Sequence, residues 1–263
     1  MSRPFFGPTK PIPFAHRGGA KRWPENTVLA FRNSAELGYR HIETDVHETS
    51  DGHFVLFHDP TLERTTNGSG LLREHTLAEL RQLDAGFNFN ENGSYPFRHA
   101  GLQIPTLDEA LSADPAIHYN LEVKPADPGL ARRLWDYIEH HGIHDRVLVA
   151  SAHDLVTDEF RRHAMGRVVT SSGRDGALRF WAMARAGLGK HAIVPFDALQ
   201  VPTSFRGMRV VTPRFVEAAH LHGIQIHIWT INDPAEMESL LAAGVDGLMT
   251  DLPEVLLDVI AKH

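Results

Sequence analysis

The chain has 263 residues, of which 42% are hydrophobic and 22% are charged, enough apolar material for a large core in a globular protein. It contains no cysteine, which excludes disulfide bonds and thiolate metal ligands. Its formal net charge of −7 argues against general nucleic-acid binding, which needs a basic surface to displace counterions.

The N-terminal residues 1–13 combine several prolines with a short apolar patch. They lack the charged start and the long apolar stretch that mark a signal peptide or a membrane anchor. We therefore expect no transmembrane segment, and a cytoplasmic location as the default.

From residue 12 onward, short apolar runs alternate with amphipathic stretches. Strands are expected over residues 12–15, 39–46, 118–123, 147–152, 167–170, 198–201, 224–229 and 247–249. Helices are expected over residues 27–37, 106–113, 129–141, 156–164, 177–186, 212–222, 234–243 and 253–261. Repeated strand–helix units predict a parallel α/β sheet. Eight of them favour one closed (β/α)8 barrel over residues 1–263, although the pattern alone leaves an open doubly wound sheet possible.

One segment, at about residues 59–103, interrupts this alternation. It is rich in Asn, Gly, Thr and Phe, and a short helix is expected within it over residues 77–83. A long excursion inside a compact domain usually has a function or a structure of its own. We interpret it as a small insertion after the second strand that covers one side of the barrel mouth, the alternative being a surface loop without a role.

Carboxylates interrupt two of the predicted strands. Alternate side chains of a strand point the same way, so Glu43 and Asp45 share one face, as Glu122 and Lys124 do in the next strand. In a barrel, the three carboxylates would converge at the C-terminal rim, where active sites of this architecture are built. Such a set suits one hard divalent cation, Mg²⁺ or Ca²⁺. The alternative is a set of ion pairs between these carboxylates and nearby cations.

Two histidines also lie at the ends of apolar runs. His16 precedes Arg17 and two glycines, which permit close backbone approach to a ligand, and His58 ends the run 54–57. Two histidines at one site can divide proton transfer between them, whereas a lone histidine at a strand end is more often structural. Arg17 is a natural bidentate partner for a phosphate.

Two further residues have both a structural and a functional interpretation. Glu25, in the run Pro-Glu-Asn-Thr at the start of the first helix, either belongs to a plain helix start or takes part in the site. Trp229, on the same face of its strand as His227, either walls the substrate pocket or packs in the core.

These motifs, taken in order from about residue 12 to 255, resemble the glycerophosphodiester phosphodiesterases. The matching runs are His16-Arg17-Gly18, Pro24-Glu25-Asn26-Thr27, Glu43-Thr44-Asp45-Val46, Thr49-Ser50-Asp51-Gly52, His58-Asp59, Arg64-Thr65-Thr66-Asn67-Gly68, Pro105-Thr106-Leu107, Leu121-Glu122-Val123-Lys124-Pro125, Trp229-Thr230 and Gly247-Leu248-Met249-Thr250-Asp251. Over residues 126–202 only the spacing is similar.

The resemblance implies a TIM barrel with an insertion after the second strand. It implies metal-dependent hydrolysis of a small glycerophosphodiester substrate to sn-glycerol 3-phosphate and an alcohol, through attack by a glycerol hydroxyl and a cyclic phosphate that water opens. By position, the roles it implies are acid–base catalysis for His16 and His58, metal binding for Glu43, Asp45 and Glu122, phosphate binding for Arg17 and Lys124, and glycerol contact for Trp229.

Three alternatives remain open at this point. A relative that hydrolyses lysophospholipids would share the chemistry and differ in the pocket for the alcohol. A barrel that only binds a phosphorylated ligand would not need both His16 and His58. A metal-dependent aldolase or isomerase would have no need of two histidines beside Arg17 and Lys124. The residues do not distinguish Mg²⁺ from Ca²⁺, and they indicate no oligomeric state.

Overall fold

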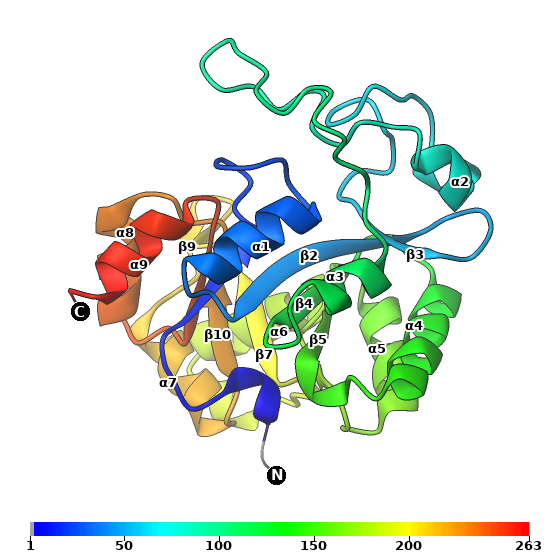
Figure 1. Ribbon diagram of the computed structural model, residues 1–263. Helices are drawn as coiled ribbons and strands as arrows, with labels where there is room; N and C mark the ends of the chain where they lie inside the picture. Colours follow the sequence, from blue (N-terminus) through cyan, green and yellow to red (C-terminus); the bar gives the residue numbers. More distant parts are fainter. Residues whose placement is uncertain (1–2, 263) are drawn as a thin grey trace.

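The computed structural model describes residues 3–262, and its main feature is a barrel of eight parallel strands (Figure 1). The strands follow the order β6-β5-β4-β2-β1-β11-β10-β7. Their bounds are β1 (Ile12–His16), β2 (His41–Glu48), β4 (His118–Val123), β5 (Val147–Ala150), β6 (Val169–Thr170), β7 (Ala198–Val201), β10 (Gln225–Ile228) and β11 (Gly247–Thr250). A parallel bridge between Ser171 and Ala198 joins the two ends of the sheet. The predicted (β/α)8 barrel is confirmed, and the open sheet is excluded.

Helices surround the strands (Figure 1). They are α1 (Val28–Glu36), α3 (Leu107–Ala113), α4 (Pro128–His141), α5 (Asp154–Ala164), α6 (Arg174–Arg185), α7 (Pro213–Leu221), α8 (Pro234–Ala242) and α9 (Pro253–Ile260). The short 3-10 turns are η1 (Pro4–Phe6), η2 (Leu72–Glu74), η3 (His144–Arg146) and η4 (Gly189–His191). Within residues 3–262, none of the helices has the length and apolar character needed to cross a bilayer.

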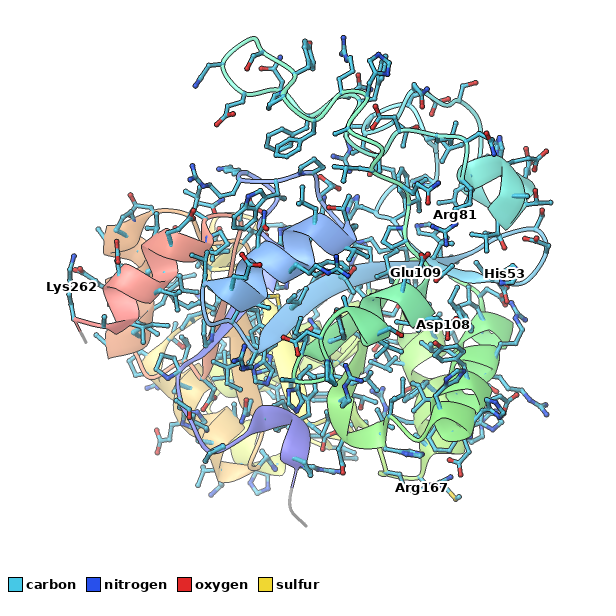
Figure 2. The ribbon with its side chains drawn as sticks, viewed as in Figure 1. His53, Arg81, Asp108, Glu109, Arg167 and Lys262 are labelled. Atoms are coloured by element: carbon cyan, nitrogen blue, oxygen red, sulfur yellow. The ribbon has the colours of Figure 1, made fainter. Side chains whose placement is uncertain are left out.

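The segment between β2 and α3 leaves the regular alternation of strands and helices. A short strand, β3 (Phe54–Leu56), first pairs antiparallel with the end of β2. Residues 59–103 then project beyond the barrel and carry the short helix α2 (Leu77–Leu80) (Figure 1). They share a small apolar core with the β3 region, formed by Val55, Phe57, Leu62, Leu72, Leu80, Ala85 and Ile104. An ion pair of 2.6 Å between Arg81 and Glu109 ties this insertion to α3, and both residues are labelled in Figure 2.

A second hairpin was not predicted from the sequence. Strands β8 (Ser204–Phe205) and β9 (Met208–Arg209) pair antiparallel just after β7. Arg206 and Gly207 form the turn with φ values of 49° and 75°, the conformation typical of a two-residue hairpin turn. The strands are too short to give a periodic apolar pattern, so this part of the chain looked like a connection.

Three histidines and several aromatic rings fill the N-terminal end of the barrel. The rings of His41 and His118 stack with centroids 5.1 Å apart, and Phe14 lies 4.8 Å from His227. The turn η1 closes this end, where the carbonyl of Phe5 accepts a 2.6 Å hydrogen bond from His41 Nε2. Burial lowers the pKa of His41 to about 4 and that of His227 to about 3. Both rings are therefore neutral at pH 7.

Acidification is expected to destabilise the fold through these two buried rings. In the unfolded chain both take up a proton below about pH 6.5, whereas in the folded chain they resist it down to about pH 4. Their contribution to the free energy of unfolding is therefore complete above about pH 6.5 and declines below it, by roughly 2 kcal/mol per ring at pH 5. Urea unfolding at about pH 7 and pH 5 measures this loss.

A matched set of variants isolates the two rings from the other groups that titrate in acid. His41→Gln and His227→Gln should each lose less stability between the two pH values than the parent chain. The exposed His140 on α4 provides the control, and His140→Gln should behave as the parent. An equal loss in all four proteins would show that neither buried ring is responsible.

Candidate active site

The turn after β1 brings two functional groups to the C-terminal mouth of the barrel. His16 is the last residue of β1, and Arg17 follows in a left-handed conformation with φ 52°. Gly18 and Gly19 also have positive φ, and a Cβ on Gly18 would lie 2.8 Å from Cβ of Ala30. Glycine is therefore required for the turn to pack against α1. The backbone N–H of Arg17 donates to the carbonyl of Glu43, at 2.8 Å, which anchors the turn on β2.

A carboxylate orients the ring of His16. Nδ1 of His16 donates to Oδ1 of Asp251 at 2.6 Å, and Nε2 lies 3.7 Å from Oε2 of Glu43. The side-chain amide of Asn232 donates to the other oxygen of Asp251 at 2.9 Å. These bonds fix which ring nitrogen carries the proton and direct Nε2 toward the carboxylates.

Three carboxylates converge beside His16, as the strand periodicity predicted. The parallel register places Asp45 of β2 opposite Glu122 of β4, and Glu43 lies two residues earlier on the same face of β2. One oxygen from each of Glu43, Asp45 and Glu122 lies within 4.8 Å of the others. Glu43 and Asp45 are buried, whereas Glu122 is partly exposed toward the mouth.

Cationic and amide groups surround Asp45. Lys124 Nζ lies 3.1 Å from one oxygen of Asp45 and 3.2 Å from Glu122, and Arg17 Nε lies 3.2 Å from the other oxygen of Asp45. Asn26 Nδ2 also donates to Asp45, at 2.8 Å. Burial disfavours charge on Asp45, but Lys124 and Arg17 outweigh it and lower its pKa. Asp45 is therefore ionised.

The pKa values of Glu43 and His16 are both raised above their ordinary values. Burial, followed by the negative charge of Asp45, raises the pKa of Glu43 to about 8. For His16, burial opposes protonation, but Glu43 and the hydrogen bond to Asp251 outweigh it and raise the pKa of the ring. Burial is thus the main cause of the shift at Glu43, and neighbouring carboxylates add to the shift at Glu43 and cause the shift at His16.

The cluster fits a hard divalent cation. Its oxygen donors come from three carboxylates on adjacent strands, and oxygen ligands are those that Mg²⁺ and Ca²⁺ prefer. Such a cation would also offset the negative charge of Asp45, which adds to burial in raising the pKa of Glu43. Glu43, Asp45 and Glu122 are thus the residues that could hold it.

His58 approaches the same mouth from β3. The N–H of Phe57 donates to the carbonyl of Asp45 at 3.0 Å, which holds the chain beside β2 just before His58. His58 Nδ1 donates to Oδ1 of Asp59 at 2.6 Å, so this ring is paired with a carboxylate just as His16 is. The two histidines thus have equivalent partners.

The remaining predicted residues lie at the mouth with different contacts. Arg17 donates from Nη1 to Oε1 of Glu25 at 3.0 Å, so Glu25 contacts one of the predicted site residues. Trp229 directly follows β10 and has 44% of its surface exposed. No hydrogen bond or ion pair among residues 3–262 joins Trp229 to the carboxylates.

Sequence reasoning assigned no role to two buried or half-buried partners of these groups. Asp251 lies 235 residues from His16, and only the pairing of β1 with β11 brings them together. Asn26, with φ 56°, accepts from Thr44 Oγ1 at 2.7 Å and donates to Asp45. Asp251 directly follows the apolar strand β11, which was a signal for it, whereas Asn26 could be interpreted from the sequence only as part of a helix start.

The sequence matches the model of the glycerophosphoryl diester phosphodiesterase family over residues 16–255. It is 34% identical over 258 residues to the glycerophosphodiester phosphodiesterase of Caldanaerobacter subterraneus subsp. tengcongensis, covering 96% of this chain and 99% of that one. It is 35% identical over 255 residues to the probable glycerophosphodiester phosphodiesterase 2 of Mycobacterium tuberculosis, covering 95% and 90%.

Solved structures have the same fold. One is the glycerophosphoryl diester phosphodiesterase domain of an uncharacterised protein from Mycobacterium tuberculosis, with a TM-score of 0.82 at 23% identity, covering 97% of this chain and 100% of that one. Another is a phosphodiesterase of Oleispira antarctica in complex with the product sn-glycerol-3-phosphate. Its TM-score is 0.78 at 26% identity, covering 96% of this chain and 97% of that one.

Proposed function

Because the chain belongs to the glycerophosphoryl diester phosphodiesterase family, we propose that it hydrolyses glycerophosphodiesters to sn-glycerol 3-phosphate and an alcohol. The observation that carries the proposal is the meeting of two carboxylate-paired histidines and three carboxylates at one barrel mouth. A barrel that only binds a phosphorylated ligand would have no use for two oriented proton-transfer groups.

The two imidazoles share the proton transfers. One accepts the proton of a glycerol hydroxyl as its oxygen attacks phosphorus, and the other protonates the oxygen of the departing alcohol. The product of this step is a cyclic glycerol phosphate. Water then attacks the same phosphorus with the two roles exchanged, and the ring oxygen leaves with a proton. Asp251 and Asp59 keep Nε2 of His16 and His58 available for these transfers.

Cations at the mouth bind the phosphate. Arg17 and Lys124 flank Asp45 and can direct N–H groups at the non-bridging oxygens. A divalent ion, Mg²⁺ or Ca²⁺, held by Glu43, Asp45 and Glu122 would supply further positive charge to offset the charge that develops on the phosphoryl group. The negative net charge of the whole chain is thus compatible with an anionic substrate.

The reaction is tested directly with glycerophosphocholine. The purified chain is incubated with this substrate and Mg²⁺ or Ca²⁺, and release of glycerol 3-phosphate is coupled to its dehydrogenase. Signal that depends on the chain and on the cation supports the proposal. Absence of signal from glycerophosphocholine with either cation would contradict it.

Replacing Trp229 by alanine is expected to raise KM about tenfold and to leave kcat within about threefold. The indole is half exposed at the mouth and bears no proton-transfer group, so its contact with glycerol stabilises the bound substrate and the transition state equally. Steady-state kinetics measure both constants. Leu221, which is exposed at the end of α7, provides the control, because Leu221→Ala should change neither. A change confined to kcat would contradict the assigned contact.

A further inference from the structure

A chain of alternating charges connects the two sides of the mouth, and Arg64 of the insertion lies at its centre. Arg64 donates from Nη1 and Nη2 to the two oxygens of Glu25, at 2.8 and 2.7 Å. Its Nε donates to Oδ2 of Asp59 at 2.5 Å. Glu25 in turn binds Arg17, and Asp59 binds His58. One guanidinium thus contacts the partner of a phosphate-binding cation and the partner of a catalytic imidazole.

The neighbours of Arg64 do not form this connection. Thr66 Oγ1 donates to the carbonyl of Leu62 at 2.7 Å, and Asn67 Oδ1 accepts from the N–H of Asp84 at 2.9 Å. These bonds close the loop within the insertion. Arg64 instead reaches Glu25 on the barrel, 39 residues earlier in the chain.

The geometry of the contact is more specific than that of an ordinary surface ion pair. The side chain of Arg64 is 47% exposed, whereas those of Glu25 and Asp59 are 14% and 20% exposed. A bidentate fork fixes the plane of a carboxylate, and a lysine cannot reproduce it. Arg64 therefore fixes the orientation of two mostly buried carboxylates, although its own side chain is half exposed.

We infer that Arg64 is a positioning residue. It fixes the orientation of the Arg17 side chain through Glu25 and that of the His58 ring through Asp59. The inference rests on the proposed function. Because Arg64 contacts both carboxylates, its guanidinium orients the phosphate-binding residue Arg17 and the proton-transfer residue His58 together. The insertion therefore contributes a side chain to the active site through Arg64.

Removal of Arg64 should lower activity without unfolding the insertion. The insertion keeps its apolar core and the ion pair between Arg81 and Glu109, and the exposed Arg64 leaves no cavity. We expect Arg64→Ala to lower kcat/KM for glycerophosphocholine by roughly tenfold to a hundredfold, as loss of an orienting partner typically does. Its melting temperature should stay within about 2 °C of the parent. The kcat/KM of Arg64→Lys should be closer to that of Arg64→Ala than to that of the parent, because a lysine cannot form the bidentate contact.

Two readouts separate positioning from a general structural effect. Guanidinium chloride at low millimolar concentration should restore part of the activity of Arg64→Ala, and sodium chloride at equal ionic strength should not. Asp59→Asn should lower kcat strongly in the parent and much less in Arg64→Ala, because the carboxylate has already lost its orientation. Arg73, another exposed arginine of the insertion, is the matched control, and Arg73→Ala should match the parent.

The outcomes are distinguishable from failure of the proposed function. Turnover by the parent chain is measured first, and its absence would refute the proposed function itself. If the parent is active and Arg64→Ala equals it, the positioning role is wrong. The positioning role would also be wrong if guanidinium did not restore the activity of Arg64→Ala and if the losses in Arg64→Ala and Asp59→Asn were fully additive.

Discussion

Replacing either His16 or His58 by alanine is expected to lower kcat for glycerophosphocholine by at least about a hundredfold. Each ring is held by a carboxylate through Nδ1, which leaves Nε2 for proton transfer to or from the substrate. Because each step of the proposed reaction needs one proton acceptor and one proton donor, loss of either ring impairs both steps. The double variant should therefore lose little more than a single one.

The control for this prediction is a histidine outside the mouth. His53 lies at the turn between β2 and β3, with 52% of its side chain exposed (Figure 2). His53→Ala should retain parent activity, and all the variants should keep a cooperative thermal transition. Near-normal turnover in both His16→Ala and His58→Ala would refute their assignment as the acid–base pair.

The carboxylate cluster was predictable because it depends on two local rules. Side chains alternate along a strand, which places Glu43 and Asp45 on one face of β2, and parallel strands end at one rim, which brings Glu122 beside them. Neither rule requires the details of packing. The same reasoning placed His16 at the rim, since it ends β1.

The partners of these groups depend on contacts that no local rule supplies. Asp251 meets His16 only because the last strand pairs with the first, and Arg64 meets Glu25 only because the insertion packs onto the turn before α1. Such contacts join residues far apart in sequence, and their register depends on the whole barrel. The sequence therefore indicated which side chains carry the chemistry, whereas the orientation of each one required the fold.

Chelation with EDTA is expected to abolish turnover, and added Mg²⁺ or Ca²⁺ should restore it. The three carboxylates each offer an oxygen within 4.8 Å of the others, and oxygen donors of this kind suit a divalent ion. The same ion should raise the melting temperature of the chain, because a ligand that binds only the folded state stabilises it. Full activity in EDTA would show that catalysis does not require a divalent ion.

Substitution of one ligand separates metal binding from unspecific salt effects. Asp45→Asn should abolish both the activity and the cation-dependent rise in melting temperature. Asp258, exposed on α9, is the matched control, and Asp258→Asn should retain both. A cation-dependent rise of equal size in Asp45→Asn would place the binding site elsewhere.

The affinity for the cation should also decrease as the pH falls, because Glu43 must lose its proton to bind the ion. Without the ion, the pKa of Glu43 is about 8, because of burial and the charge of Asp45, so the carboxyl is mostly protonated at pH 7. Binding must displace that proton, and the apparent affinity should therefore fall by up to about tenfold per pH unit below pH 8. Calorimetric titration at several pH values measures this slope. In Glu43→Gln the slope should largely disappear, because the amide has no proton to lose in this range.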